Sequence, residues 1–546
     1  MKYASYADMV LVNGNVLCLD DNNTCAEAIA VKDGKILTVG SSQEILELKN
    51  DQTEVVDLSG STVIPGFIDA HTHVDLIGMM SSDKVVSCWL PPLESKDQIL
   101  KAFEERANAV PDGELIVGQG RWSQEYPKKE ELDKVAPNNP IILRTTMHFY
   151  ILNNCALKRF GITKDRPTPK ELFQVDPGSI IFRDKITGEP TGQLYDAWNF
   201  LFPQSKSFLS YGQTRSAIKK GLDKFSSFGV TTIAEFPDFY ESIRIYNDLR
   251  ASGELNMRLH LVPCVHGLHR TTSLESVLEL GLRTGFGDEW IKFGGIKLFV
   301  DRGVDTSLSS IELKEIVAAA QNAGIRVFMH ANTRKGQDMA IEAIEAAVQE
   351  FPEFDLRGQD LRGQFDVEKS SDNTPHLIEL RHRIEHMGNR LIDYAFFDRV
   401  KNAGAIALPT SYFMNIGRHF PKDMKVFMYK TMLEKGLCVP GNSDSGAAEP
   451  EAPNPLYEIW CMVARKSRAG DDVFPEEGIS ILEALKVYTR HSAYACLEED
   501  IKGSIERGKL ADLAVLNKNP LETATDDLPD IKTEMTLIGG RIVYTA

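Results

Sequence analysis

Short apolar runs alternate with stretches of helical periodicity from residue 63 to residue 499. Eight of these runs have the length and the aliphatic content of buried strands. They span residues 63–73, 229–235, 258–265, 295–300, 325–330, 381–386, 405–410 and 437–444. Strands that alternate with helices favour a parallel sheet, so the pattern predicts an α/β protein whose residues 63–499 form a (β/α)8 TIM-like barrel.

The stretches between the apolar runs carry signals for helix starts. Ser309 with Glu312, and Ser480 with Glu483, have the spacing of a capping box. Asn454-Pro455 combines a preferred N-cap residue with a preferred first helical residue. Each signal stands just before an apolar periodic segment, so we expect a helix to begin at each of these three places.

Both ends of the chain consist of short apolar runs joined by tight turns. Asn13-Gly14, Asp33-Gly34 and Gly539-Gly540 each separate two such runs, and these dipeptides favour two-residue hairpins. Because both ends have the same pattern of short strands and tight turns, we predict one small, discontinuous β-sandwich domain made of residues 1–62 and 500–546.

Two segments interrupt the alternation of strands and helices. Residues 77–215 follow the first strand, and the carboxyl ends of barrel strands form the catalytic face, so we expect this insertion to cap a pocket there. The segment 352–375 is polar and follows a helix, which predicts a mobile surface loop on the opposite face.

Composition and charge narrow the class of protein. The chain has 546 residues, of which 42% are hydrophobic and 25% charged, as in ordinary globular proteins. Its formal net charge of -17 argues against nucleic acid as a partner. The eight cysteines include no Cys-x-x-Cys pair, which indicates reduced thiols. With neither an apolar leader nor a long uncharged apolar stretch, we expect a cytoplasmic protein without a membrane partner, and a homodimer is left open.

Residues with metal-binding side chains stand at the ends of the predicted strands. They end strands one, four, five, six and eight: His71, His73, Lys297, His330, His386 and Asp444. His71 and His73 are two residues apart in one strand, so their imidazoles point to the same face. The strand ends of a barrel converge on one mouth, where imidazoles and a carboxylate together would make a metal site.

Each of these residues also has a structural interpretation. Lys297 could extend its amine to solvent, and Asp444 could cap a turn. His330 and His386 could be hydrogen-bonded core residues. That interpretation must hold six times, always at a strand end, so we favour the metal site. Glu235, which ends the second strand, stays open as a pocket acid or as an outward-facing residue.

Longer motifs stand at and between the strand ends. They are Pro65–His73, Gly188–Gly192, Arg383–His386, Ser443–Ser445, Asn454–Leu456 and Gly503–Asp512. With these motifs the chain resembles the amidohydrolase superfamily, and within it the YtcJ-like amidohydrolases (amidohydrolase family 3). The first motif is similar to the opening motif of the superfamily, whereas the combination is typical of the branch.

The resemblance implies a site for two divalent metal ions, expected to be zinc. His71, His73 and Asp444 would bind one ion, and the two remaining strand-end histidines the other. Lys297 would be carboxylated and would bridge the ions. The alternative is that Asp301 or Glu235 supplies the bridging carboxylate and that Lys297 only packs. Asp444 would move the proton of a metal-activated water to the leaving amine. The implied reaction is hydrolysis of a non-peptide C–N bond (class EC 3.5) in a small amide-like, N-acyl or N-formyl substrate.

Three residues are candidates for substrate contact: Trp122, His148 and Tyr412. The branch often has Asp-Gly-His where this chain has Thr146-Met147-His148. His148 is therefore either a catalytic residue that binds the substrate carbonyl or its oxyanion, or a structural histidine. The two aromatic residues either line the mouth or belong to the core, which is the commoner place for aromatic side chains. In the mouth they would favour an apolar or aromatic N-acyl substrate.

Three functions compete at this stage. A binuclear amide hydrolase comes first, a mononuclear deaminase or cyclic amide hydrolase second, and a non-enzymatic scaffold last. Deaminases of the superfamily lack the strand-four lysine and carry a glutamate one turn after the strand-five histidine. This chain has Lys297, and the segment Ala331–Arg334 contains no glutamate. A scaffold would have lost ligands, whereas all six are present here.

Overall fold

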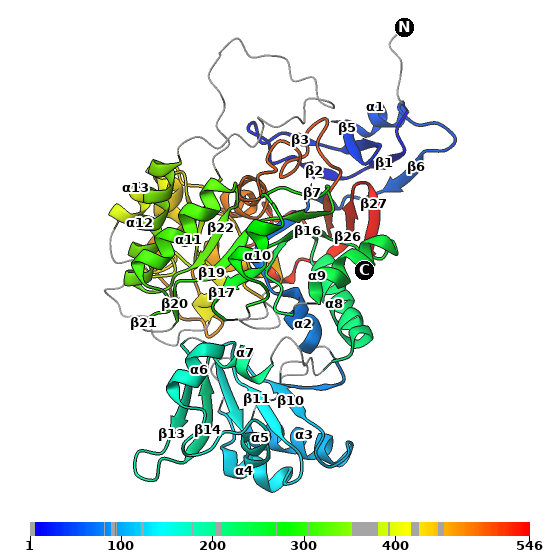
Figure 1. Ribbon diagram of the computed structural model, residues 1–546. Coiled ribbons are helices and arrows are strands. Elements are labelled where there is room, and N and C mark those ends of the chain that lie inside the picture. Colours follow the sequence, from blue (N-terminus) through cyan, green and yellow to red (C-terminus); the bar gives the residue numbers. More distant parts are fainter. Residues whose placement is uncertain are drawn as a thin grey trace.

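The computed structural model describes most of the chain and places it in three parts (Figure 1). The described residues are 6–80, 82–88, 93, 95–121, 125–176, 178–202, 209–239, 241–268, 270–302, 305–351, 380–390, 394–415, 425–445 and 453–546. Sheets and helices form the centre, segments from both termini lie together at one side, and the insertion forms a separate lobe. The predicted loop 352–375 lies outside the described residues.

Two parallel sheets form the central part. One has the strand order β18-β16-β15-β8 and the other the order β17-β19-β22-β23-β24. Their strands are β8 (Phe67–Thr72), β15 (Val230–Glu235), β16 (Arg258–Leu261), β17 (Cys264–His266), β18 (Ile291–Phe293), β19 (Ile296–Phe299), β22 (Val327–His330), β23 (Arg383–Glu385) and β24 (Ile406–Leu408). Because β16 leads directly into β17, and β18 into β19, two successive chain segments connect the sheets.

A glycine allows the second of these connections. Gly295 has a φ of +142°, and a Cβ at this position would lie 2.3 Å from the carbonyl oxygen of Arg326. Only glycine combines this backbone angle with so close an approach. The chain can therefore bend between β18 and β19, pairing first with β16 and then with β22.

The segment predicted as the eighth strand, residues 437–444, does not form a regular strand. It still lies against β8, because the Ala70 amide donates to Gly441 O, and the Asp444 amide donates to His71 O, each at 2.9 Å. On its other side the Asn442 side chain donates to Pro409 O at 2.7 Å. Asp444 has a φ of +45°, in the left-handed region, and this conformation interrupts strand geometry.

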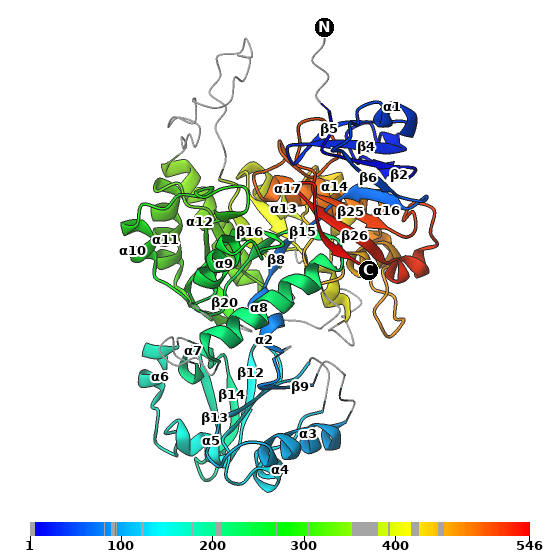
Figure 2. The same cartoon turned by 90° about the vertical axis from the view of Figure 1, so that its right-hand side faces the viewer.

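Helices flank the parallel sheets on the outside (Figure 2). They are α8 (Tyr211–Ser226), α9 (Ser242–Ala251), α10 (Leu274–Glu279), α11 (Ser310–Asn322), α12 (Arg334–Glu350), α13 (Ala395–Asn402), α14 (Tyr429–Glu434), α15 (Pro455–Ala464), α16 (Ile481–Lys486) and α17 (Ser492–Ala495). The predicted caps at Ser309, Asn454 and Ser480 are confirmed. Across the described part of the chain, no helix is both long and apolar enough to cross a membrane.

Both termini contribute to a pair of sheets that share one apolar core. One sheet has the order β5-β4-β1-β6 and the other the order β27-β26-β25-β7-β2-β3. Their strands are β1 (Met9–Val12), β2 (Asn15–Leu17), β3 (Cys25–Ala26), β4 (Ala28–Lys32), β5 (Lys35–Gly40), β6 (Glu54–Asp57), β7 (Thr62–Pro65), β25 (Leu513–Leu516), β26 (Thr533–Ile538) and β27 (Arg541–Thr545), with helix α1 (Ser42–Leu46) between β5 and β6. Leu11 and Val31 of one sheet pack in the same cluster as Val63 and Leu513 of the other.

Two of the three predicted terminal hairpins are present. The strands around Asp33-Gly34 pair antiparallel, and so do those around Gly539-Gly540. The hairpin predicted at Asn13-Gly14 is wrong, because β1 and β2 belong to different sheets. Both edges of β1 are already paired, one with β4 and one with β6, so β2 has no free edge to join.

The predicted strand Val63–His73 is wrong in its first part, because it divides at Gly66. Before the glycine, β7 pairs with β25 in the terminal sheet; after it, β8 pairs with β15 in the parallel sheet. A Cβ at Gly66 would lie 2.3 Å from Cγ2 of Thr231, so the absence of a side chain lets the segment pass close to β15. One continuous segment thus links the terminal sheets to the strand that ends at His71 and His73.

The insertion after β8 forms a mixed sheet with its own helices. The strand order is β13-β14-β12-β11-β10-β9. The elements are α2 (Val74–Met80), β9 (Val85–Ser87), α3 (Lys96–Asn108), β10 (Ile116–Gln119), α4 (Lys129–Val135), β11 (Ile141–Arg144), β12 (Phe149–Leu152), α5 (Asn154–Arg159), α6 (Pro169–Val175), β13 (Ile180–Arg183), β14 (Pro190–Tyr195) and α7 (Trp198–Leu201). In Figures 1 and 2 the sheet of the insertion lies below the parallel sheets, and α2 lies between them, beside α8.

Candidate metal centre

His71, His73 and Asp444 form a buried cluster at the end of β8. One ligand atom from each of the three lies within 4.8 Å of the others. Oδ1 of Asp444 is 3.5 Å from Nε2 of His71 and 3.6 Å from Nε2 of His73. His71 lies in β8 and His73 directly follows it, and the backbone bonds between residues 441–445 and this segment bring the aspartate to them.

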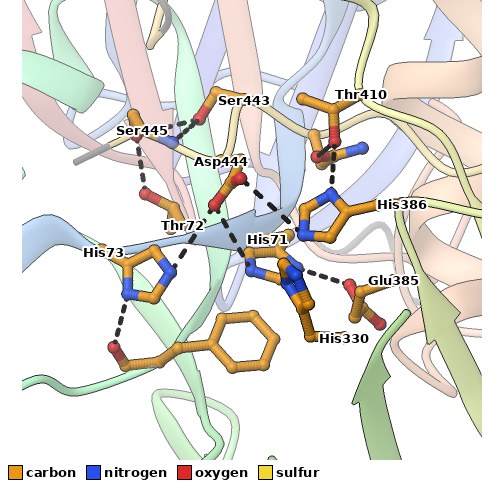
Figure 3. Close-up of polar contacts among 12 residues, drawn as sticks. His71, Thr72, His73, His330, Glu385, His386, Thr410, Ser443, Asp444 and Ser445 are labelled. Atoms are coloured by element: carbon orange, nitrogen blue, oxygen red, sulfur yellow. Dashed lines mark hydrogen bonds and ion pairs between the residues drawn. The ribbon is translucent and has the colours of Figure 1, made fainter. Parts of the chain in front are cut away.

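The other three predicted ligands meet this cluster. Nε2 of His386 lies 3.8 Å from Oδ2 of Asp444, and the ring centroids of His330 and His386 are 4.6 Å apart. Nζ of Lys297 lies 3.5 Å from Nε2 of His71. Figure 3 shows the four imidazoles gathered around the Asp444 carboxylate. The structure therefore brings together all six strand-end residues.

A second layer of acceptors fixes the imidazole rings. Nδ1 of His71 is 2.5 Å from Oε2 of Glu385, and Nδ1 of His73 is 2.8 Å from Oδ2 of Asp238. Nδ1 of His386 is 3.3 Å from Oγ1 of Thr410. With Nδ1 engaged in this way, the Nε2 atoms of these rings face the centre of the site, which is the arrangement that supports metal ligands.

Arg383 in turn fixes Glu385. Its Nε and Nη2 atoms each lie 2.7 Å from an oxygen of that carboxylate, and both residues are fully buried. The sequence analysis did not predict this role, although Arg383 and Glu385 stand two residues apart and therefore share one face of the strand before His386. Asp238 was also missed, because it follows β15 in a loop and no periodic signal marks it.

The backbone is in an uncommon conformation at two of the six residues. His386 has a φ of +68° and Asp444 a φ of +45°. Such conformations cost about 1–3 kcal/mol each in non-glycine residues and cluster at functional sites. Main-chain bonds hold both residues in place: the His386 amide donates to Leu408 O at 2.7 Å, and the Asp444 amide to His71 O at 2.9 Å.

Burial and nearby charges set the protonation of the centre. Burial, reinforced by neighbouring positive charges, lowers the pKa values of His71, His330 and His386 well below the usual histidine value. Burial also lowers the pKa of Lys297 to about 8 and raises that of Asp444 to about 6. These three imidazoles are therefore neutral at pH 7, and the Asp444 carboxyl is largely ionised.

This donor set fits a divalent metal ion. Neutral imidazole nitrogens and a carboxylate are the ligands of zinc and of related transition metals. His73 differs from the other histidines, because the Asp238 carboxylate outweighs the effect of burial and raises the pKa of His73. A metal ion would displace that proton from Nε2 and leave the Nδ1 bond to Asp238 in place.

Glu235 and Asp301, the other candidate acids, have structural roles. Glu235 is buried and accepts hydrogen bonds from the Val74 amide at 2.9 Å and from the Tyr246 hydroxyl at 2.6 Å. It therefore caps helix α2 and is neither a pocket acid nor an outward-facing residue. Oδ2 of Asp301 accepts from the amide and the hydroxyl of Thr333, each at 2.7 Å, and so fixes the loop after β22, while Oδ1 lies 3.8 Å from Nε2 of His330.

The predicted substrate residues have different surroundings. Nδ1 of His148 lies 2.6 Å from Oδ1 of Asp196, and the His148 ring is partly exposed. Tyr412 is buried against Tyr457, with ring centroids 5.6 Å apart, while its neighbour Phe413 stacks on His386. Trp122 lies outside the described residues.

Comparisons with known proteins agree with this chemistry. The model of a family described as "Amidohydrolase family" matches residues 54–544. An N-substituted formamide deformylase of Arthrobacter pascens is 28% identical, over 98% of each chain. YtcJ of Bacillus subtilis (strain 168), which is named as an amidohydrolase, is 27% identical over 95% of this chain and 96% of its own.

Solved structures support the fold. An uncharacterized metal-dependent hydrolase of Pyrococcus horikoshii superposes with a TM-score of 0.69 at 20% identity, and covers 95% of this chain and 99% of its own. One of Pyrococcus furiosus gives 0.66 at 21% identity, and covers 94% and 100%. At this level of identity the likeness concerns the fold alone.

Proposed function

The chain belongs to the amidohydrolase family, as its motifs predicted, and on that premise we propose that it hydrolyses a C–N bond in a small amide-like molecule. Membership of the family supports an amidohydrolase, and the buried cluster of His71, His73 and Asp444 supports its dependence on a metal ion. One observation carries the proposal that it acts on a C–N bond: three buried imidazoles converge on the Asp444 carboxylate, and the fourth, that of His330, packs against His386.

We also propose that the two parallel sheets form a single eight-stranded barrel. In it, β16 with β17, and β18 with β19, each take one position, and residues 437–445 take the eighth. The hydrogen bonds of this segment to β8 and to Pro409, beyond β24, support closure. The terminal sheets would then form the predicted sandwich. In a barrel of this kind the six strand-end residues would lie at one mouth, which is where such enzymes carry their active sites.

Two divalent ions, zinc by the character of the donors, would fit the six residues. His71, His73 and Asp444 would hold one ion, and the other two histidines the second. Bound there, the ions would supply Lewis acidity, which lowers the pKa of water and polarises a carbonyl group. The protein contributes the fixed orientation of the rings through Glu385, Asp238 and Thr410.

Asp444 is the proposed proton carrier. Its carboxylate would accept a proton from the attacking water and return it to the nitrogen of the leaving amine. The balanced reaction joins one water to the amide and releases a carboxylic acid and an amine. Burial places the pKa of Asp444 at about 6, close enough to neutrality for the group to accept and then release the same proton.

Lys297 is proposed to carry a carboxyl group. A neutral lysine amine adds to CO2 and loses a proton, which gives a carbamate with two oxygen ligands. Lys297 is suited to this step because burial lowers the pKa of its amine to about 8, so a share of it is neutral near pH 7. Asp301, the alternative source of a bridge, is already engaged by Thr333.

His148 is the proposed substrate contact from the insertion. Its Nδ1 is held by Asp196, so Nε2 is the atom available to a substrate. A protonated ring would donate from Nε2 to the carbonyl oxygen as negative charge develops there. Because a relative that spans 98% of the chain is a formamide deformylase, N-formyl amines are the first substrates to test.

Metal analysis combined with a substrate panel tests the proposal. We expect about two metal ions per chain and hydrolysis of at least one among N-formyl, N-acetyl and aromatic N-acyl amines and cyclic imides. Lys297→Ala should lose activity, and added short carboxylic acids should restore part of it. A metal-loaded protein that hydrolyses none of these, or that deaminates a heterocycle with a single ion, would refute the assignment to amide hydrolysis.

A further inference from the structure

A small cavity lies at the amino ends of the parallel strands, away from the metal centre. Its volume is about 50 Å³. Its lining includes the buried residues His260, Arg326, Arg383, Cys496 and Glu498 and the partly exposed Lys292. Arg326 precedes β22 and Arg383 begins β23, whereas the candidate metal ligands His330 and His386 stand at the other ends of the same two strands.

The first guanidinium at this cavity, Arg326, lacks one partner. The side chain is 2% exposed. Its Nε donates to Arg381 O at 2.7 Å, and its Nη1 donates to Ala495 O. Nη2 has no hydrogen-bond partner within the described part of the chain. Leaving a buried charged donor unpaired is costly, so the structure provides for an acceptor at this position.

The second guanidinium, Arg383, repeats the pattern. Its Nη2 donates to Ala70 O at 2.8 Å, and Nε and Nη2 together hold the Glu385 carboxylate. Nη1 is buried and has no partner among the residues that the structure describes. Both guanidiniums lie over the ring of Phe328, at 5.1 Å for Arg326 and 4.5 Å for Arg383. The two unpaired nitrogens thus belong to side chains that share one wall of the cavity.

Positive charge exceeds negative charge around this space. Lys292 and Lys502 both pair with Glu498, which also accepts from His260 at 2.7 Å. Glu385 offsets Arg383, and no carboxylate in the described structure pairs with Arg326. Burial raises the pKa of the Cys496 thiol to about 11, so Cys496 adds no negative charge near pH 7.

We propose that this cavity binds a small monovalent inorganic anion of the halide class, held between Nη2 of Arg326 and Nη1 of Arg383. An anion there satisfies both unpaired donors and offsets the excess positive charge. The volume suits such an ion with a few waters, since a water needs about 10–15 Å³ of such space, and it is too small for an organic ligand. Chloride is the natural occupant.

The proposed anion is connected to the metal centre by three residues. Arg383 would bind the anion through Nη1 while it holds Glu385 through Nε and Nη2. Glu385 in turn holds Nδ1 of His71 at 2.5 Å. The proposal does not depend on the reaction at the metal centre, so it stands or falls independently of the proposed function.

Anomalous diffraction tests the site directly in the unaltered protein. Crystals of the full chain grown or soaked in sodium bromide should give an anomalous bromide peak within about 3.5 Å of both guanidiniums. A second measurement is the melting temperature in chloride-free buffer, titrated with sodium chloride against sodium gluconate at equal ionic strength. We expect a saturable rise of a few degrees with chloride that gluconate does not reproduce.

Two variants separate the site from general salt effects. Arg326→Gln should abolish the chloride-dependent rise. Arg258→Gln is the matched control: Arg258 is equally buried, but its guanidinium is paired with Asp512 at 2.7 and 3.0 Å, so this variant should keep the rise. If bromide crystals show only ordered water in the cavity, or if Arg326→Gln keeps the chloride effect, the anion site is refuted. The diffraction result decides the matter if the variant fails to fold.

Discussion

At the carboxyl ends of the parallel strands, buried imidazole nitrogens and a carboxylate can donate electron pairs to a cation. At the amino ends, buried guanidinium N–H groups can donate hydrogen bonds to an anion. The metal centre gathers imidazole nitrogens around the Asp444 carboxylate. The cavity at the other end is lined by two guanidiniums, by Lys292 and by one carboxylate, Glu498, which pairs with Lys292. The first region suits cations and the second suits anions, although both lie in the same pair of sheets.

Only a few residues along each strand separate groups that suit a cation from groups that suit an anion. Arg326 and His330 are four residues apart, and Arg383 and His386 are three apart. Because β22 and β23 are short, each strand contributes to both regions. The two regions are not independent, since Arg383 holds Glu385 and Glu385 holds His71. Substitutions at either end therefore test how far the two regions are coupled.

The largest effect is expected from His71→Ala. It removes a ligand that lies 3.5 Å from Asp444, so activity should be abolished and the metal content should fall while the fold persists. Metal analysis and circular dichroism measure these outcomes. His382→Gln is the matched control, because this histidine is equally buried but bonds to Gln321 and to the Val327 amide. Full activity in His71→Ala, or equal losses in both variants, would contradict the assignment.

Asp444→Asn should have the next largest effect. The amide keeps the shape of the side chain but cannot accept the proton of water. We expect kcat to fall by about two to four orders of magnitude, the usual contribution of a general base, and more if a ligand bond is also weakened. Steady-state kinetics at saturating metal measures the change. A fall of less than tenfold would assign the base to another residue.

Glu385→Gln tests the residue that connects the two regions. The amide of Gln carries no negative charge, so it accepts a weaker hydrogen bond from Nδ1 of His71 than the carboxylate does. It also loses the ion pair with Arg383. Loss of such an outer partner typically lowers metal affinity or activity by about 10–100-fold. Titration with a metal chelator measures the affinity. Wild-type affinity in this variant would mean that the ring of His71 is held by packing alone.

Glu498→Gln tests the amino-terminal region through the pH dependence of stability. Burial opposes ionisation of Glu498, but Lys502 and His260 outweigh it and hold the pKa of Glu498 well below its usual value. A carboxylate with a depressed pKa adds stability above its unfolded pKa of about 4.3, and this stability is lost as pH falls further. Wild-type protein should therefore lose free energy of unfolding in acid more steeply than the variant. Parallel curves from pH 7 to pH 3 would contradict this.

The strand-end residues could be predicted from sequence because alternation and strand length place their side chains on one face. His71 and His73 are the simplest case, since they stand two residues apart in one strand. Their outer partners could not all be predicted: Asp238 lies in a loop, where no period relates it to His73. The prediction of a hairpin at Asn13-Gly14 was wrong for a different reason. Local turn preference does not reveal that both edges of β1 are paired with other strands.

The division of the first strand at Gly66 has a consequence for synthesis of the protein. β7 lies between β2 and β25, and roughly 450 residues separate β7 from β25 along the chain. At about 5–20 residues per second, a ribosome needs roughly 20 to 90 seconds to make that stretch. Until then β7, which leads into β8, has no partner on that side. The two histidines that follow this segment are thus translated long before the sheet that anchors it is complete, so a metal ion can be bound stably only after β25 has been made.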